Sequence, residues 1–188
     1  MASEIIVQNL KGPASGSNAN KVIIPSGHTL DASSGAFIPE PDQILQVKHL
    51  DFQDQTSTTT SQAYIDATGT GITLTAKGTN SKFYLKANCQ MYHSGGINGA
   101  NIGFKRGSTK ILGADGGSGD TWFGFGNATN LTNASFNISR SYLDSPSLSS
   151  GSSVTYKIMF GRWNSGTLYL NYTTYNTTSH FTVMEIAQ

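Results

Sequence analysis

The sequence predicts an all-β fold, an antiparallel β-sandwich or jelly roll that carries an extended N-terminal arm. Three observations predict this fold. Apolar and polar residues alternate with period two from residue 44 onward, Gly, Asn, Ser and Asp turns separate the alternating segments, and no stretch shows the apolar stripe of an amphipathic helix. We expect about nine to eleven strands.

Residues 1–43 form the predicted arm. Its segments 11–20 and 33–41 are rich in Gly, Ser, Ala and Pro, which cannot bury enough apolar surface to offset the entropy of ordering them. The arm is therefore expected to become ordered against other polypeptide chains. Two short β-prone segments supply the candidate anchoring residues, which are Ile5, Ile6, Val7, Val22, Ile23 and Ile24.

Residues 44–188 form the predicted β-sandwich domain. The last strand is predicted over 181–187, where it closes a sheet centrally. Apolar residues stand on both of its faces, which makes Met184 and Ile186 candidate subunit-interface residues. The apolar faces of the strands before it are marked by Leu45/Val47, Ala63/Ile65/Ala67, Ile72/Leu74/Ala76, Phe83/Leu85/Ala87/Cys89/Met91, Ile102/Phe104, Ile111, Phe123/Phe125, Phe136/Ile138, Val154/Tyr156/Ile158/Phe160 and Leu168/Leu170/Tyr172.

Charge and hydropathy exclude two classes of partner. Charged residues make up 12% of the chain, the net charge is +1, and the Lys and Arg residues form no basic stripe, so nucleic acid is not an expected partner. No apolar run has the length of a membrane span, and the N-terminus lacks signal-peptide features, so we expect no membrane insertion and synthesis in a cytoplasm.

The sequence shows no catalytic signature, and we expect no catalytic residue, no metal site and no cofactor. His28, His49, His93 and His180 are far apart and lack metal-ligand spacing, so we interpret them as surface or turn histidines. Cys89, the lone cysteine, lies on the apolar face of its strand and is expected to be buried and inert.

One loop leaves an alternative open. Asp115–Asp120 carries two carboxylates among glycines and resembles a loop that could surround a calcium ion. Its spacing departs from the known calcium-loop patterns and it is one carboxylate short, so an ordinary loop between strands is the preferred interpretation.

Aromatic residues are more numerous than one face of a small sandwich needs. Tyr and Trp near Gly-rich loops can stack on sugar rings, which makes Trp122, Trp163, Tyr172 and Tyr175 candidate glycan-binding residues. Packing within the subunit or along a threefold axis is the competing explanation.

Strand and turn patterns recur through nearly the whole chain, at residues 3–7, 24–31, 44–48, 64–68, 80–83, 154–157, 166–170 and 182–186. In these segments the chain resembles virion structural proteins of tailed bacteriophages, chiefly marine and cyanobacterial ones, that are often described as tail-fibre-like. The body of such proteins is similar to the trimeric jelly rolls of the C1q and tumour necrosis factor type.

The resemblance implies a homotrimeric, non-enzymatic virion protein, made in the host cytoplasm and anchored by its arm to capsid or tail proteins. As a decoration or cement protein it would reinforce the shell, and as a short fibre it would contact the host. The alternative is a receptor- or glycan-binding fibre tip or a lectin-like module that binds host surface glycans. A glycan hydrolase would need two carboxylates about 5–9.5 Å apart, for which the sequence offers no convincing pair.

Overall fold

The computed structural model describes residue 26 and residues 41–59, 63–95, 99–113, 123–124, 133–163 and 166–188. The chain divides into two units, Met1–Ile38 and Pro39–Gln188. The arm's anchoring residues and the Asp115–Asp120 loop lie outside the described residues, so both remain predictions. Asp42 and Gln43 pair with the C-terminal end of the second unit: the Asp42 N–H donates to the Ala187 carbonyl (3.0 Å), and the Ala187 N–H donates to the Gln43 carbonyl (2.9 Å).

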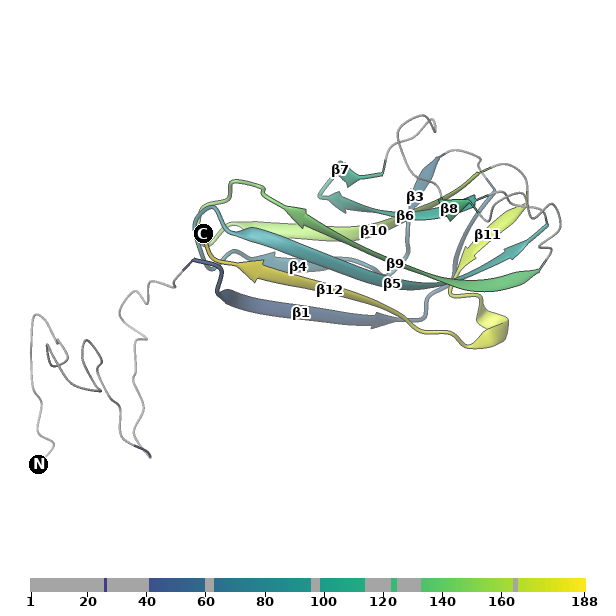
Figure 1. Cartoon of the computed structure of the whole chain (residues 1–188), viewed down its shortest axis with the longest axis horizontal. Coiled ribbons are helices and arrows are strands. Elements are labelled where there is room, and N and C mark those ends of the chain that lie inside the picture. Colours follow the sequence, from purple (N-terminus) through teal and green to yellow (C-terminus); the bar gives the residue numbers. More distant parts are fainter. Residues whose placement is uncertain are drawn as a thin grey trace, which may run out of the picture. The chain divides into compact units, whose positions relative to one another are not determined.

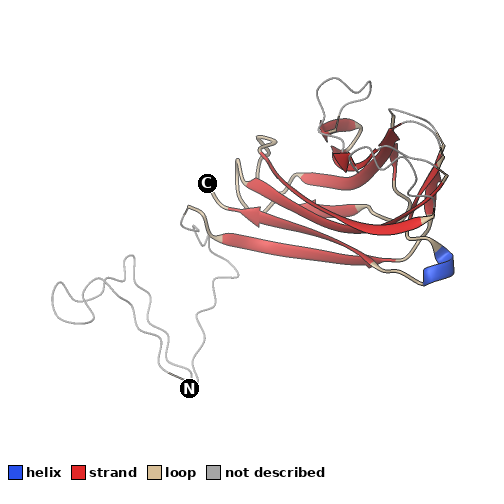
Figure 2. Ribbon diagram, turned by 45° about the vertical axis from the view of Figure 1, so that its right-hand side comes forward, coloured by secondary structure: helices blue, strands red, loops and turns tan. Residues whose placement is uncertain are grey.

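The second unit is a sandwich of two antiparallel sheets, and its described helical content is one short turn (Figures 1 and 2). In the first sheet the long strand β5 pairs with β9 along one edge and with β12 and then β11 along the other. Strand β1 lies outside β12, and β2 lies outside β11. The strands of this sheet are β1 (Ile44–Phe52), β2 (Thr56–Thr58), β5 (Lys82–Ser94), β9 (Ala134–Asp144), β11 (Thr167–Leu170) and β12 (Ser179–Ile186).

The second sheet is built around β10. One edge of β10 pairs with β6, and the other pairs with β4 and then β3. Strands β7 and β8 pair with the free edge of β6. The strands are β3 (Tyr64–Asp66), β4 (Ile72–Thr75), β6 (Gly99–Arg106), β7 (Thr109–Leu112), β8 (Phe123–Gly124) and β10 (Ser153–Trp163), and the turn η1 spans Thr173–Tyr175.

The connectivity is that of a jelly roll. Neighbours within a sheet are distant in sequence, as β1 is from β12 and β4 from β10, so the chain crosses repeatedly between the two layers. This confirms the predicted all-β sandwich. It also confirms the central place of the last strand, because β12 lies between β1 and β5.

The core between the sheets follows the predicted alternation. On β5, Phe83, Leu85, Ala87 and Cys89 are all fully buried, and Tyr156, Ile158 and Phe160 face them from β10. Burial raises the pKa of the Cys89 thiol to about 12, so it stays protonated at neutral pH.

Two predictions about strand faces are wrong for local reasons. Val47 does not share the inward face with Leu45, because a β-bulge between Ile44 and Gln46 shifts the register and turns Val47 outward, where it is 52% exposed. Tyr172 does not continue the strand of Leu168 and Leu170, because β11 ends at Leu170 and Asn171 adopts a left-handed conformation (φ 52°).

Candidate functional surface on the first sheet

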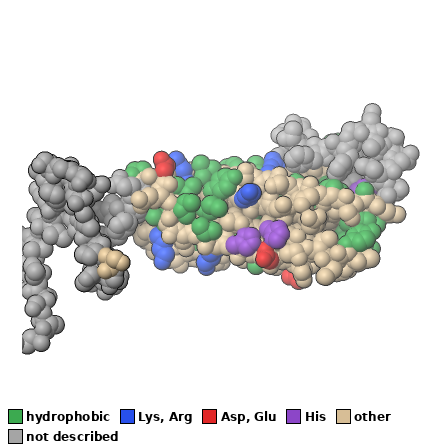
Figure 3. All heavy atoms as spheres, turned by 60° about the horizontal axis from the view of Figure 1, so that its bottom comes forward, with side chains coloured by type: hydrophobic (Ala, Val, Ile, Leu, Met, Phe, Trp, Pro, Cys, Tyr) green, Lys and Arg blue, Asp and Glu red, His purple; other side chains and the backbone are tan. Residues whose placement is uncertain are grey.

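The outer face of the first sheet, the side away from the core, carries the candidate functional groups. Figure 3 shows hydrophobic side chains near the beginning of β1, two histidines with a carboxylate farther along the strands, and hydrophobic side chains again beyond them. The ring contacts identify a group of tyrosines at this far end. Each group combines residues from strands that are far apart in sequence and adjacent in the sheet.

The first group, called here the apolar patch, consists of a row of four residues and a neighbouring pair. Register places Val47, Met184, Tyr84 and Leu143 side by side in the row, which crosses β1, β12, β5 and β9. Ile44 and Ile186 form the pair next to this row. Val47 and Leu143 are 52% and 48% exposed, so the row is an apolar surface that nothing within the described residues covers.

The patch contains Met184 and Ile186, the two residues that the sequence offers as subunit-interface candidates. Both are half-buried and point outward, while Phe181 and Val183 of the same strand are fully buried in the core. Strand β12 is therefore apolar on both faces, as predicted.

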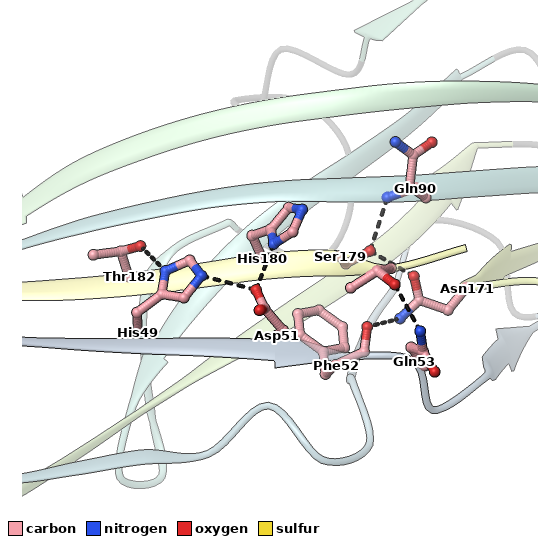
Figure 4. A network of polar contacts seen from close by, with 10 residues as sticks. His49, Asp51, Phe52, Gln53, Gln90, Asn171, Ser179, His180 and Thr182 are labelled. Atoms are coloured by element: carbon pink, nitrogen blue, oxygen red, sulfur yellow. Dashed lines mark hydrogen bonds and ion pairs between the residues drawn. The ribbon is translucent and has the colours of Figure 1, made fainter. Parts of the chain in front are cut away.

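The second group is called here the histidine cluster and consists of His49, Asp51 and His180 (Figure 4). Asp51 Oδ1 accepts hydrogen bonds from His180 Nδ1 (2.6 Å) and from His49 Nε2 (2.8 Å). These bonds, the one from His180 first, hold the pKa of the Asp51 carboxyl below its usual value. The two imidazole rings stack with centroids 5.8 Å apart, and His49 Nδ1 contacts Thr182 Oγ1 (2.7 Å).

Strand geometry produces this cluster. His49 and Asp51 are two residues apart on β1 and so share a face, and register sets His180 of β12 directly opposite Asp51. From the sequence, His49 and His180 are predicted only to be surface or turn histidines. The His-x-Asp spacing of His49 and Asp51 is visible in the sequence, but His180 is 129 residues from Asp51 and only the β1–β12 pairing joins it to the others.

The third group is called here the tyrosine cluster and consists of Tyr92, Tyr169, Tyr172 and Tyr175. The Tyr92 and Tyr172 rings stack with centroids 4.3 Å apart, and Tyr169 lies 4.8 Å from Tyr172. Tyr175 meets Tyr172 edge to face at 5.6 Å and is 52% exposed.

A polar network holds the turn that brings Tyr172 into this cluster (Figure 4). The Asn171 side chain donates to the Phe52 carbonyl (2.9 Å) and accepts a hydrogen bond from the Ser179 hydroxyl (2.6 Å). Ser179 in turn accepts the N–H of Gln90 (2.9 Å). These bonds fix Asn171 in its left-handed conformation, so the chain reverses after β11 and places Tyr172 over Tyr92.

The predicted glycan-binding residues do not form one group. Tyr172 and Tyr175 belong to the tyrosine cluster, whereas Trp163 ends β10 in the second sheet and Trp122 lies outside the described residues. Tyr92 and Tyr169 are not among the predicted glycan-binding residues, and they complete the cluster because register pairs them across β5 and β11.

Comparisons with known proteins assign no family. No protein-family model matches the chain, and no curated protein matches it significantly. Within the part of the chain that the structure describes, no helix has the length and apolar character needed to cross a membrane.

Several solved structures are distantly similar. The structure of the infectious bursal disease virus Gx strain matches with 13% identity and a TM-score of 0.36 over 86% of this chain and 42% of that one. A VP2 subviral particle of infectious bursal disease virus matches with 12% identity and a TM-score of 0.35 over 94% and 46%. Dimeric latent PorU from Porphyromonas gingivalis matches with 13% identity and a TM-score of 0.34 over 89% and 14%. The chain thus spans less than half of each of these proteins, and similarity at this level assigns neither a family nor a function.

Proposed function

We propose that the chain is a non-enzymatic structural protein of a tailed-bacteriophage virion. Three copies assemble into a β-sandwich appendage that the N-terminal arm, residues 1–43, joins to capsid or tail proteins. The resemblance of the sequence to virion proteins supports a place in a virus particle. The jelly-roll topology supports an appendage built from β-sandwich subunits. The observation that carries the assembly is the apolar patch on the outer face of the first sheet.

The patch has the features of a contact surface. A contiguous row of half-exposed apolar side chains crosses four strands, whereas isolated exposed apolar residues are ordinary on a protein surface. A second copy is the proposed occupant, because a net charge of +1 puts little repulsion between copies and, in a cyclic trimer, every subunit presents the same apolar patch to its neighbours around the threefold axis.

The arm supplies the attachment in this proposal. Each arm offers two short apolar segments, around Ile5–Val7 and Val22–Ile24. Three arms on one trimer bind together, since linking weak contacts raises the effective concentration of each one.

A charge placed in the patch tests the assembly. Leu143→Asp sets a carboxylate in the proposed contact, at the β9 end of the apolar row, and is expected to convert the trimer to monomers, measured by size-exclusion chromatography with light scattering. Ser139→Asp is the matched control, because Ser139 is exposed on the same face of β9 but opposite the polar Asn88, outside the patch. Equal masses for Leu143→Asp and Ser139→Asp would show that the apolar patch is not the subunit interface.

Virus particles made without this chain distinguish a role as a cement protein from a role as a fibre. Particles that lack a cement protein are fragile but still adsorb to cells. Particles that lack a fibre stay intact and adsorb poorly. Heating and adsorption assays on particles made without this chain distinguish these outcomes.

The tyrosine cluster favours a second candidate function, glycan binding by the exposed end of the sheet. Tyr175, which is 52% exposed beside the stacked pair Tyr92 and Tyr172, offers an aromatic ring on which a sugar ring can stack. Tyr175→Ala is expected to abolish binding of the protein to host lipopolysaccharide or cells, while Thr174→Ala in the same turn leaves binding unchanged. Binding that survives Tyr175→Ala would exclude the cluster as the sugar site.

A further inference from the structure

We propose that the histidine cluster is a binding site for a late first-row divalent metal ion such as Zn²⁺. His49, Asp51 and His180 supply two imidazole nitrogens and one carboxylate oxygen, and the ligand atoms all lie within 4.8 Å of one another. The site is complete within one chain, so this inference does not depend on assembly or on the proposed function.

The backbone fixes the three donors on one face. His49 and Asp51 stand two residues apart on β1, and β12 presents His180 opposite Asp51. Ligand atoms bound to one zinc ion at about 2.1 Å can be at most about 4.2 Å apart. The cluster therefore needs only small rotations of side chains that are 49–60% exposed, and the strands need not move.

The hydrogen bonds of the cluster lie where metal–ligand bonds would form. Asp51 Oδ1 accepts hydrogen bonds from the two imidazoles at 2.6 Å and 2.8 Å, and a cation placed among the three groups would take the place of the two ring protons. Thr182 Oγ1 contacts the other ring nitrogen of His49 at 2.7 Å. Because a hydroxyl can accept as well as donate, Thr182 can hold the Nδ1–H tautomer that leaves Nε2 free for the metal.

The donor set selects the class of metal. Imidazole nitrogens suit Zn²⁺, Cu²⁺ and Ni²⁺, whereas Ca²⁺ and Mg²⁺ require oxygen ligands in larger number. Three protein ligands leave one tetrahedral position open to water or to a donor from another molecule. Exposed Lys86 of β5 stands opposite Thr182 on the same face and places a positive charge on the side of the sheet that carries the site.

The test titrates ZnCl₂ into the full-length chain, prepared without a histidine tag and stripped of metal, in a calorimeter at neutral pH. We expect one ion per chain, no competing heat from CaCl₂, and visible d–d bands with Co²⁺ that report nitrogen and oxygen ligands. His180→Asn and Asp51→Asn should each weaken Zn²⁺ binding by at least about tenfold. Circular dichroism checks that these exposed substitutions leave the fold intact.

Controls separate a ligand role from a general effect on the surface. Asp66→Asn removes an exposed carboxylate from the second sheet and should leave Zn²⁺ affinity unchanged. Thr182→Val should weaken binding by about tenfold, and Thr182→Ser should restore it. The assignment is overturned if the chain binds no Zn²⁺, or if Zn²⁺ binds equally well after His49, Asp51 and His180 have all been replaced.

Discussion

At the scale of single residues, Glu185 has the most unusual environment. It lies between outward-facing Met184 and Ile186 on β12, and its side chain is fully buried. Burial opposes ionisation, but hydrogen bonds from Gln46 and from the backbone N–H groups of Gly78 and Lys77 (2.9 and 2.8 Å) outweigh it and hold the pKa of Glu185 below its usual value. The carboxylate thereby ties β12 to β1 and to the chain after β4.

Glu185→Gln is expected to lower the free energy of unfolding by about 1–3 kcal/mol at neutral pH. The amide that replaces one oxygen is itself a donor and meets N–H donors, which leaves buried groups unsatisfied. Urea unfolding followed by fluorescence measures the change. Asp66→Asn, which breaks an exposed ion pair with Lys105, is the control and should cost less than about 1 kcal/mol.

Glu185 also makes the free energy of unfolding depend on pH. Because the pKa of Glu185 is lowered on folding, its stabilisation is complete above the unfolded value of about 4.3 and is lost as the pH falls through the folded value. Unfolding free energies measured across acidic pH should therefore fall more steeply for the natural chain than for Glu185→Gln. Parallel curves would show that Glu185 is not the group that titrates.

At the scale of elements, period-two alternation predicts the core faces of β5 and β10 because these long strands are regular and apolar on one side. The face of Val47 could not be predicted, since a one-residue bulge reverses the alternation and leaves no mark in composition. The histidine cluster and the tyrosine cluster could not be predicted either, because each depends on the register between distant strands.

Strand pairing at the edge of the second sheet depends on Gly103. A Cβ at this position would collide with the backbone carbonyl of Leu112 on β7, next to the irregular register between Phe104 and Lys105. Gly103→Ala is therefore expected to cost about 1–3 kcal/mol of unfolding free energy, measured by urea titration.

Gly71→Ala provides the matched control. A Cβ there meets only the flexible end of Lys157, at 3.9 Å, and Gly71 needs no left-handed backbone. The change should stay within about 1 kcal/mol. Equal effects of the two substitutions would mean that the close approach of β6 to β7 does not constrain residue 103.

At the scale of the whole molecule, the two faces of the first sheet have different tasks in this account. The inner face packs against the core. Along its strands the outer face carries the apolar patch, then the histidine cluster and then the tyrosine cluster. Assembly through the patch would cover one end of this face and leave the tyrosine cluster at the other end open to ligands.

The mass of the full-length chain in solution tests this account most directly. Sedimentation equilibrium over a range of concentrations is predicted to give three times the chain mass of 20.0 kDa, and Leu143→Asp is predicted to give the chain mass alone. A natural chain that sediments as a single copy at every concentration would contradict the account.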